Sequence, residues 1–172
     1  DSFCLLTVGR IAYEKGYDLL VDAAILLKQR GYAFRWYICG DGPLREHIEK
    51  RIAQNHLEAT IILLGYCDNP YSLMRSCDLY VQTSISEGYG ITIAEAALLG
   101  CVIVSTGVAG AMEEIVPGVN GAITDMNGKA IADAVAELFD DPRRLQAMRN
   151  RMVDYDNLNQ DSLQMLNTIL RV

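Results

Sequence analysis

Two glutamates and two glycines lie close together in the segment SEGYGITIAEAALLG, residues 86–100. Glu87 directly precedes the turn from Gly88 to Gly90, and Glu95 follows within a stretch that has a helical pattern. Glycine lets the backbone approach a ligand closely, and the free N–H groups at the start of a helix bind phosphate oxygens. The turn therefore predicts an anion-binding site at the start of a helix.

The two carboxylates suit a different part of a ligand, because an ionised carboxylate only accepts hydrogen bonds and cannot hold phosphate. Glu95 suits a diol, such as the two hydroxyls of a ribose. Its helical neighbours are apolar on all sides, so we expect the helix to be mostly buried and Glu95 to need a partner. Glu87 can meet a sugar hydroxyl or a developing positive charge. The alternative is structural: a favourable charge at a helix start for Glu87 and a surface position for Glu95.

Two cations lie in the segment GRIAYEKG, residues 9–16, which follows an apolar run. A positive charge is unfavourable near the start of a helix, so Arg10 and Lys15 indicate an anionic partner such as a diphosphate. Solvated surface charges are the alternative. An anion site, a diol site and a nearby carboxylate together describe a nucleoside diphosphate that carries a sugar.

The segment GDGP, residues 40–43, resembles the start of the dinucleotide fingerprint GxGxxG, but Arg45 occupies the third glycine position. The motif also follows the second predicted strand instead of the first, so we reject NAD binding. A tight turn with Asp41 as the N-cap of the next helix is the simpler interpretation. Close approach of the glycine backbone to a ligand is the alternative.

Short apolar runs that alternate with helical patterns must position these loops. We expect strands at residues 3–8, 34–39, 60–65, 78–84, 102–106 and 121–124. The strands are apolar throughout, which predicts a doubly wound, Rossmann-like parallel sheet of about six strands with helices on both faces. In such α/β folds ligands bind at the carboxyl ends of the strands, which here lead into loops 9–16, 40–43, 65–70, 84–90 and 106–111.

The composition is that of a globular chain: 172 residues, 51% hydrophobic and 22% charged. We expect a single domain over residues 1–172, with a polar helical tail over about residues 142–172. The net charge of −7 gives no reason to expect nucleic acid binding. No apolar run approaches the roughly 20 residues that span a bilayer. Because the chain begins at Asp1 with a strand close behind, we expect it to be a piece of a larger protein.

Five cysteines are present, and no pair has CxxC spacing: Cys4, Cys39, Cys67, Cys77 and Cys101. We expect them to be reduced core residues of a cytosolic protein. His47 and His56 have no matching cysteine pair, so we expect no zinc site.

Several segments together resemble the carboxyl-terminal domain of GT-B glycosyltransferases of the retaining GT4 family, the glycosyl transferases group 1. The resemblance extends over residues 3–140 and rests on TVGRIAYEKGYDLLVDA, GDGPLREHIE, SEGYGITIAEAALLGCVIVST and GAMEEIVPGVNG. The family's two glutamates separated by seven residues correspond to Glu87 and Glu95. Thr83 and Val102 stand where the family often has proline, and Ala109 stands where it often has glycine.

The resemblance implies a donor site for a UDP- or GDP-sugar, with no cofactor and no metal. Glu87, which contacts the transferred sugar, is then catalytic together with Arg10 and Lys15, which stabilise the leaving diphosphate. Glu95 holds the ribose hydroxyls. The donor-binding residues that the resemblance implies are Gly9, Arg10, Lys15, Gly88, Tyr89, Gly90, Ile91 and Glu95.

The family also implies an amino-terminal domain that supplies the acceptor site, so we expect the isolated chain to bind donor weakly and to transfer nothing. We expect the loop GYCDNP, residues 65–70, to meet the base through Gly65 and Tyr66. The expected location is the cytoplasm, at the inner face of a membrane through the missing domain. The expected role is assembly of a polysaccharide, glycolipid or glycoprotein. The alternatives are a non-catalytic sugar-nucleotide-binding module or partner subunit, and a GT-B relative such as a sugar-nucleotide epimerase.

Overall fold

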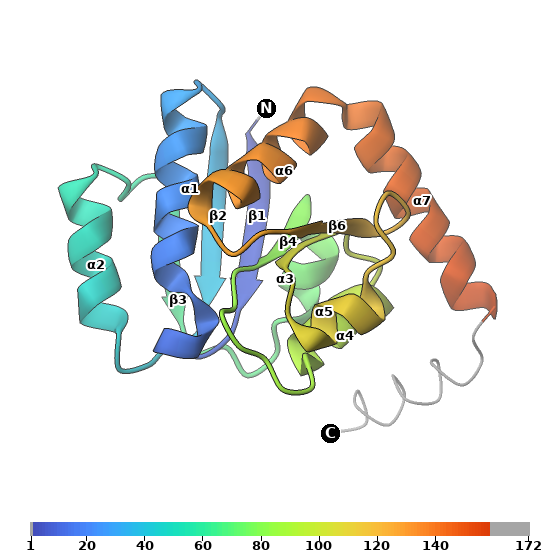
Figure 1. Ribbon diagram of the computed structural model, residues 1–172, viewed down its shortest axis with the longest axis horizontal. Coiled ribbons are helices and arrows are strands. Elements are labelled where there is room, and N and C mark those ends of the chain that lie inside the picture. The colour runs from blue at the N-terminus through green and yellow to red at the C-terminus, as the bar shows by residue number, and fades with distance from the viewer. Residues whose placement is uncertain (1, 159–172) are drawn as a thin grey trace.

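Six parallel strands form one sheet in the computed structural model, which describes residues 2–158 (Figure 1). The strands are β1 (Phe3–Val8), β2 (Phe34–Cys39), β3 (Ile61–Gly65), β4 (Leu79–Gln82), β5 (Ile103–Thr106) and β6 (Gly121–Thr124). Their order across the sheet is β3-β2-β1-β4-β5-β6, and every neighbouring pair is parallel. The predicted doubly wound, Rossmann-like fold is confirmed.

Helices cover both faces of this sheet (Figure 1). One face carries α1 (Tyr17–Gln29), α2 (Arg45–Gln54) and α6 (Gly128–Asp140), and α7 (Pro142–Leu158) continues from α6. The other face carries α3 (Tyr71–Ser76), α4 (Ile91–Leu98) and α5 (Ala109–Glu114). Each face has its own apolar core because parallel strands bury side chains on both sides.

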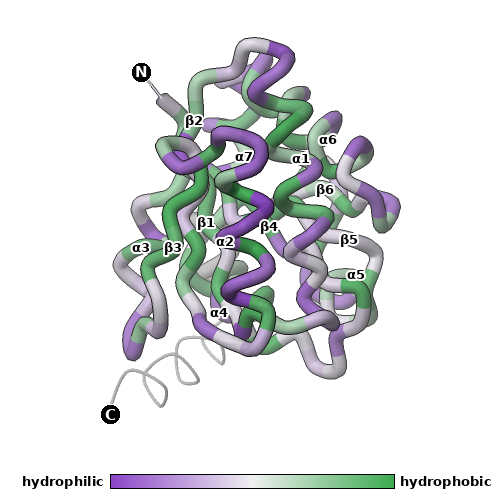
Figure 2. Tube along the Cα trace, turned by 90° about the vertical axis from the view of Figure 1, so that its left-hand side faces the viewer, coloured by the Kyte–Doolittle hydropathy of each residue, from purple (hydrophilic) through white to green (hydrophobic). Residues whose placement is uncertain are grey.

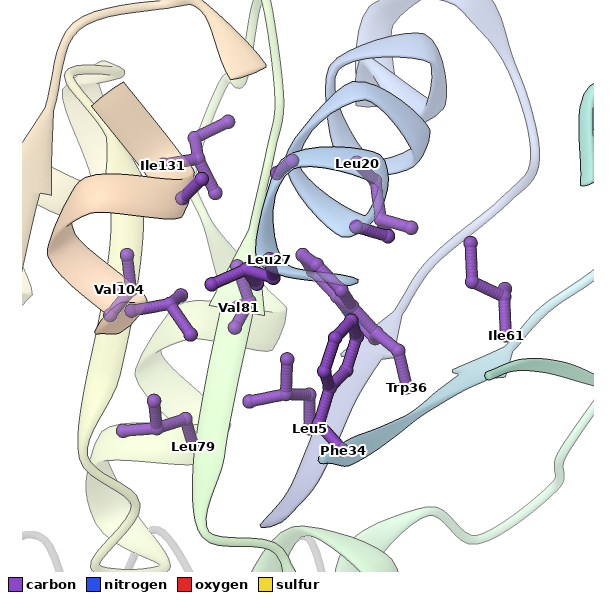
Figure 3. Close-up of a cluster of buried hydrophobic side chains, with 14 of the residues drawn as sticks. Leu5, Leu20, Leu27, Phe34, Trp36, Ile61, Leu79, Val81, Val104 and Ile131 are labelled. Carbon is purple, nitrogen blue, oxygen red and sulfur yellow. The ribbon is translucent and has the colours of Figure 1, made fainter. Parts of the chain in front are cut away.

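The larger core lies beneath α1 and α6 and is filled by branched aliphatic and aromatic side chains (Figure 3). Trp36 is fully buried there, and its indole Nε1 donates to the Thr7 hydroxyl over 3.0 Å. The Thr7 hydroxyl in turn donates to the carbonyl of Val81 over 2.6 Å. The polar atoms that this core encloses are therefore satisfied across three strands, which joins β2 to β1 and β1 to β4.

The point where the winding reverses lies between β1 and β4. From β1 the chain builds outward through β2 to β3, then returns to β4 beside β1 and builds the other way. The loops that leave β1 and β4 diverge to opposite faces, which makes this the expected ligand crevice. The two loops touch: the Thr83 hydroxyl donates to the carbonyl of Lys15 over 3.0 Å. A Cβ on Gly16 would lie 2.0 Å from the Thr83 carbonyl oxygen, so this contact requires glycine.

The predicted elements are present, with shifted ends. The strand predicted over residues 78–84 ends at Gln82, because the next two residues turn toward the loop after β1. The helix after Gly90 is confirmed, but the prediction that it is mostly buried is wrong, since only Ile93 and Ala96 are buried in it. The other apolar residues of this helix are partly buried or exposed. The core beneath α3, α4 and α5, called the second core below, therefore covers only one side of the helix.

The outer helices are polar on the side that faces solvent. In Figure 2, α2 alternates between hydrophilic and hydrophobic positions, and it buries only Ile48 and Ile52. The predicted polar helix from Pro142 is confirmed as far as Leu158, and the rest of the predicted tail lies outside the described residues. None of the helices between residues 2 and 158 has the length and apolar composition that a membrane span requires.

Cys39 and Cys67 form a disulfide between the end of β2 and the segment that follows β3. Their Cα atoms lie 5.7 Å apart, although 28 positions separate them in sequence. The prediction that the cysteines are reduced is therefore wrong for this pair, because neighbouring parallel strands bring distant positions together without CxxC spacing. Cys4, Cys77 and Cys101 are free thiols. Reduced cysteines were an argument for a cytoplasmic location, and the disulfide removes that argument. The cytoplasmic location stays a prediction.

Candidate functional site

An ion pair joins the two loops at the reversal of the sheet. Lys15 ends a short 3-10 helix, Tyr13–Lys15, that follows β1. Its Nζ donates to both carboxylate oxygens of Glu87, over 2.8 Å to Oε1 and 2.7 Å to Oε2. The two side chains are only 16% and 13% exposed. Limited exposure makes this pair stronger than a solvated surface pair.

Three neutral groups at the end of β4 support Glu87. The hydroxyl of Ser84 donates to its Oε2 over 2.9 Å, and the amide nitrogen of Gln82 does so over 3.2 Å. The Tyr80 hydroxyl lies 3.0 Å from the amide oxygen of Gln82, which aims the amide nitrogen at Glu87. Burial raises the pKa of Glu87, but the hydrogen bonds and charge of Lys15, together with Ser84 and Gln82, outweigh burial and hold that pKa below its ordinary value. Glu87 is therefore ionised at neutral pH.

The turn after Glu87 opens a cavity at the start of α4. Gly90 is the N-cap of α4 and has a φ of 61°, which favours glycine. A Cβ on Gly90 would also lie 2.9 Å from the Cα of Gly110, so the backbones of two loops meet there. The cavity has a volume of about 360 Å³ and is lined by Lys15, Glu87, Gly88, Tyr89, Gly90, Ile91 and Thr92. The structure thus gathers most of the predicted donor-binding residues around one cavity.

Glu95 lies one turn further along α4 and is not part of that cavity lining. Its Oε1 accepts a hydrogen bond from the hydroxyl of Tyr71 over 3.0 Å. Glu95 was expected to need a partner, and in the structure that partner is Tyr71 at the start of α3. Both side chains are half-buried, which leaves the carboxylate open to a ligand.

A second cavity, of about 370 Å³, lies at the ends of β1 and β2. Its lining contains the predicted residues Gly9, Arg10 and Tyr66, and also Val8, Cys39, Gly40, Asp41 and Cys67. Arg10 is exposed and, within residues 2–158, forms no ion pair. Arg10 and Lys15 thus line two different cavities. Gly65 lies at the end of β3, and its carbonyl accepts from the amide of Gly40 over 2.7 Å.

The GDGP segment, residues 40–43, forms a turn, and Gly40 and Asp41 of this turn line the second cavity. Asp41 accepts from the amide of Gly42 over 2.7 Å, whereas Leu44 is the N-cap of α2, so the prediction of Asp41 as N-cap is wrong. A Cβ on Gly40 would lie 1.9 Å from the carbonyl oxygen of Gly9, and one on Gly42 would lie 2.4 Å from that of Ile11. The glycines therefore serve the close contact between two loops.

Sequence reasoning missed five residues of these sites: Tyr71, Tyr80, Gln82, Ser84 and Thr92. A signal existed for Gln82 and Ser84, because polar side chains that end an apolar parallel strand point to buried hydrogen bonding. Thr92 has a buried hydroxyl oxygen without a hydrogen-bond partner among the described residues, at the cavity beside Glu87. The same part of the chain contains no cluster of three or more histidine, cysteine or carboxylate side chains that could hold a metal ion.

The fold is that of a Rossmann-like domain, and its candidate site lies where the winding of the sheet reverses. The family model of glycosyl transferases group 1 matches residues 1–156, so the chain belongs to this family. The alpha-D-kanosaminyltransferase of Streptomyces kanamyceticus is 33% identical over 157 residues, which cover 90% of this chain and 40% of that protein. The chain thus spans less than half the length of this relative.

Solved structures of GT-B glycosyltransferases share the fold. The pneumococcal O-GlcNAc transferase GtfA, in complex with UDP and GlcNAc, aligns with a TM-score of 0.84 at 26% identity, over 98% of this chain and 35% of that one. The C-terminal domain of the glycosyl transferase group 1 family protein LpcC from Francisella tularensis aligns with a TM-score of 0.78 at 25% identity. That match covers 88% of this chain and 83% of the domain.

Proposed function

We propose that this chain is the donor-binding domain of a retaining, metal-independent glycosyltransferase that uses a nucleoside diphosphate sugar. The observation that carries the proposal is the cavity in which Lys15, ionised Glu87 and the start of α4 meet. Such a cavity offers a cation and free backbone N–H groups to a diphosphate, and a carboxylate to a sugar. UDP is the favoured nucleotide, because the similar GtfA was solved with UDP.

Each charged group then has one role. Lys15 and the start of α4 bind the diphosphate and stabilise it as it leaves. Arg10 contacts the diphosphate from the neighbouring cavity, where Tyr66 meets the base. Glu87 contacts the transferred sugar, and Glu95 binds the ribose hydroxyls. The acceptor and the rest of the active site come from the part of the protein outside this chain, since the chain spans less than half of its relatives.

Calorimetric titration with UDP, GDP and ADP in the presence of EDTA tests the proposal. We expect binding of UDP that Glu95→Ala weakens by tenfold or more, the order of one to two hydrogen bonds to a charged group. The matched control is Glu46→Ala, since Glu46 is an exposed glutamate that pairs with Lys50 on α2, away from the site. Loss of UDP binding only in EDTA would refute metal independence. Equal UDP affinity in wild type and Glu95→Ala would refute the ribose role.

A further inference from the structure

We propose that Tyr71 is a positioning residue, which holds the Glu95 carboxylate in place for the ribose and so contributes to selection of ribonucleotides. The inference rests on the proposed function, because it assumes that Glu95 binds the ribose diol. The observation behind it is the 3.0 Å hydrogen bond from the Tyr71 hydroxyl to Oε1 of Glu95.

The hydrogen bond leaves the carboxylate free to accept from a diol. Each carboxylate oxygen has two lone pairs, and Tyr71 uses one of the four. Within the described part of the chain, Tyr71 is the one hydrogen-bond partner of the Glu95 side chain. Without it, a half-buried glutamate can sample several rotamers, and ribose binding must restrict them.

Tyr71 itself is held from both sides. Its ring packs against the second core, whose buried members include Met74 of the same helix. Its backbone amide donates to the side chain of Asn69 over 3.1 Å. Burial and the Glu95 carboxylate raise the pKa of Tyr71, so its hydroxyl keeps the proton that it donates.

The position of Tyr71 in the chain links two parts of the proposed site. Tyr71 directly follows the segment that contains Tyr66 and Cys67, both of which line the cavity beside Arg10. The disulfide from Cys67 to Cys39 fastens this segment to the end of β2. In a nucleoside the base and the ribose are covalent neighbours, so one short segment can serve both: its start faces the base, and its end orients the carboxylate for the ribose.

The experiment compares UDP with 2′,3′-dideoxy-UDP by calorimetry on the full-length protein that contains this domain. We expect the wild type to prefer UDP, and Tyr71→Phe to weaken UDP binding by about threefold to tenfold, which is the cost of ordering one flexible side chain. Binding of the dideoxy nucleotide should not change. In a Glu95→Ala background, Tyr71→Phe should have no further effect on UDP.

Tyr32→Phe is the matched control, because the Tyr32 hydroxyl donates to the Asp140 carboxylate over 2.8 Å, away from the site. Equal losses for both nucleotides in a folded Tyr71→Phe protein would show that Tyr71 only shapes the cavity, and would overturn the inference. A wild type that binds both nucleotides equally would instead refute the ribose role of Glu95 in the proposed function. Wild type that binds neither nucleotide would refute the donor site as a whole.

Discussion

The Nζ of Lys15 contacts both carboxylate oxygens of Glu87, 72 positions away in sequence, over 2.8 and 2.7 Å. The pair spans the loops that leave β1 and β4, the two strands between which the winding of the sheet reverses. An ammonium group has three N–H donors, and the two contacts with Glu87 leave one for a phosphate oxygen. Lys15 can therefore join the proposed diphosphate site to the proposed sugar site without leaving its partner.

Glu87→Gln should separate binding from transfer. It keeps the size of the side chain but removes a negative charge beside the proposed diphosphate site. We expect UDP to bind about twofold to tenfold more tightly, because less charge opposes the diphosphate, while sugar transfer by the full-length protein is lost. Calorimetry and a labelled-sugar transfer assay measure the two effects. Weaker UDP binding in a folded Glu87→Gln protein would contradict the model of the site.

The Glu87 carboxylate should also make stability depend on pH. Its pKa lies below the ordinary value of 4.5, so its contribution is complete above about pH 4.5 and is lost as the pH falls through the folded pKa. Urea unfolding of wild type and Glu87→Gln at pH 7 and at pH 3 gives the test. The wild type should be more stable than Glu87→Gln at pH 7, and the difference should shrink at pH 3. A difference that is independent of pH would exclude this linkage.

Gln82→Leu should lower the free energy of unfolding by about 1–3 kcal/mol, because it removes the nearer of the two acceptors of the buried Tyr80 hydroxyl and a donor to Glu87. Gln54→Leu, at an exposed position near the end of α2, is the control. Chemical denaturation measures both. If the two variants lose equal stability, the hydrogen bonds of Gln82 add nothing to the fold.

Removing the disulfide should cost about 3–4 kcal/mol of stability for a loop of this length, in the chain-entropy model. Cys39→Ser with Cys67→Ser, compared by urea unfolding with the oxidised wild type, measures this cost. A thiol titration of the denatured protein without reductant should find three free thiols of the five cysteines. Five reactive thiols in protein isolated without reductant would show that the bond does not form.

Local pattern was enough for the fold. Uninterrupted apolar runs are buried on both faces, and their alternation with helical segments leaves a doubly wound sheet as the arrangement that buries both. Local pattern did not predict burial or contacts that depend on distant parts of the chain. The apolar residues around Glu95 predicted a helix buried on all sides, but α4 covers one face of the sheet and buries only Ile93 and Ala96 in the core beneath it.

The sequence alone determined which elements form, in what order, and which loops bear charge, since these depend on hydrophobic periodicity and on glycine and proline within a few residues. Tertiary structure decided which of these residues meet. Strand order and register bring Lys15 to Glu87, Tyr71 to Glu95 and Cys39 to Cys67, and they separate Arg10 from Lys15 into two cavities. The physical reason is that each contact joins two segments far apart in the sequence, whose distance in space depends on the packing of the whole sheet.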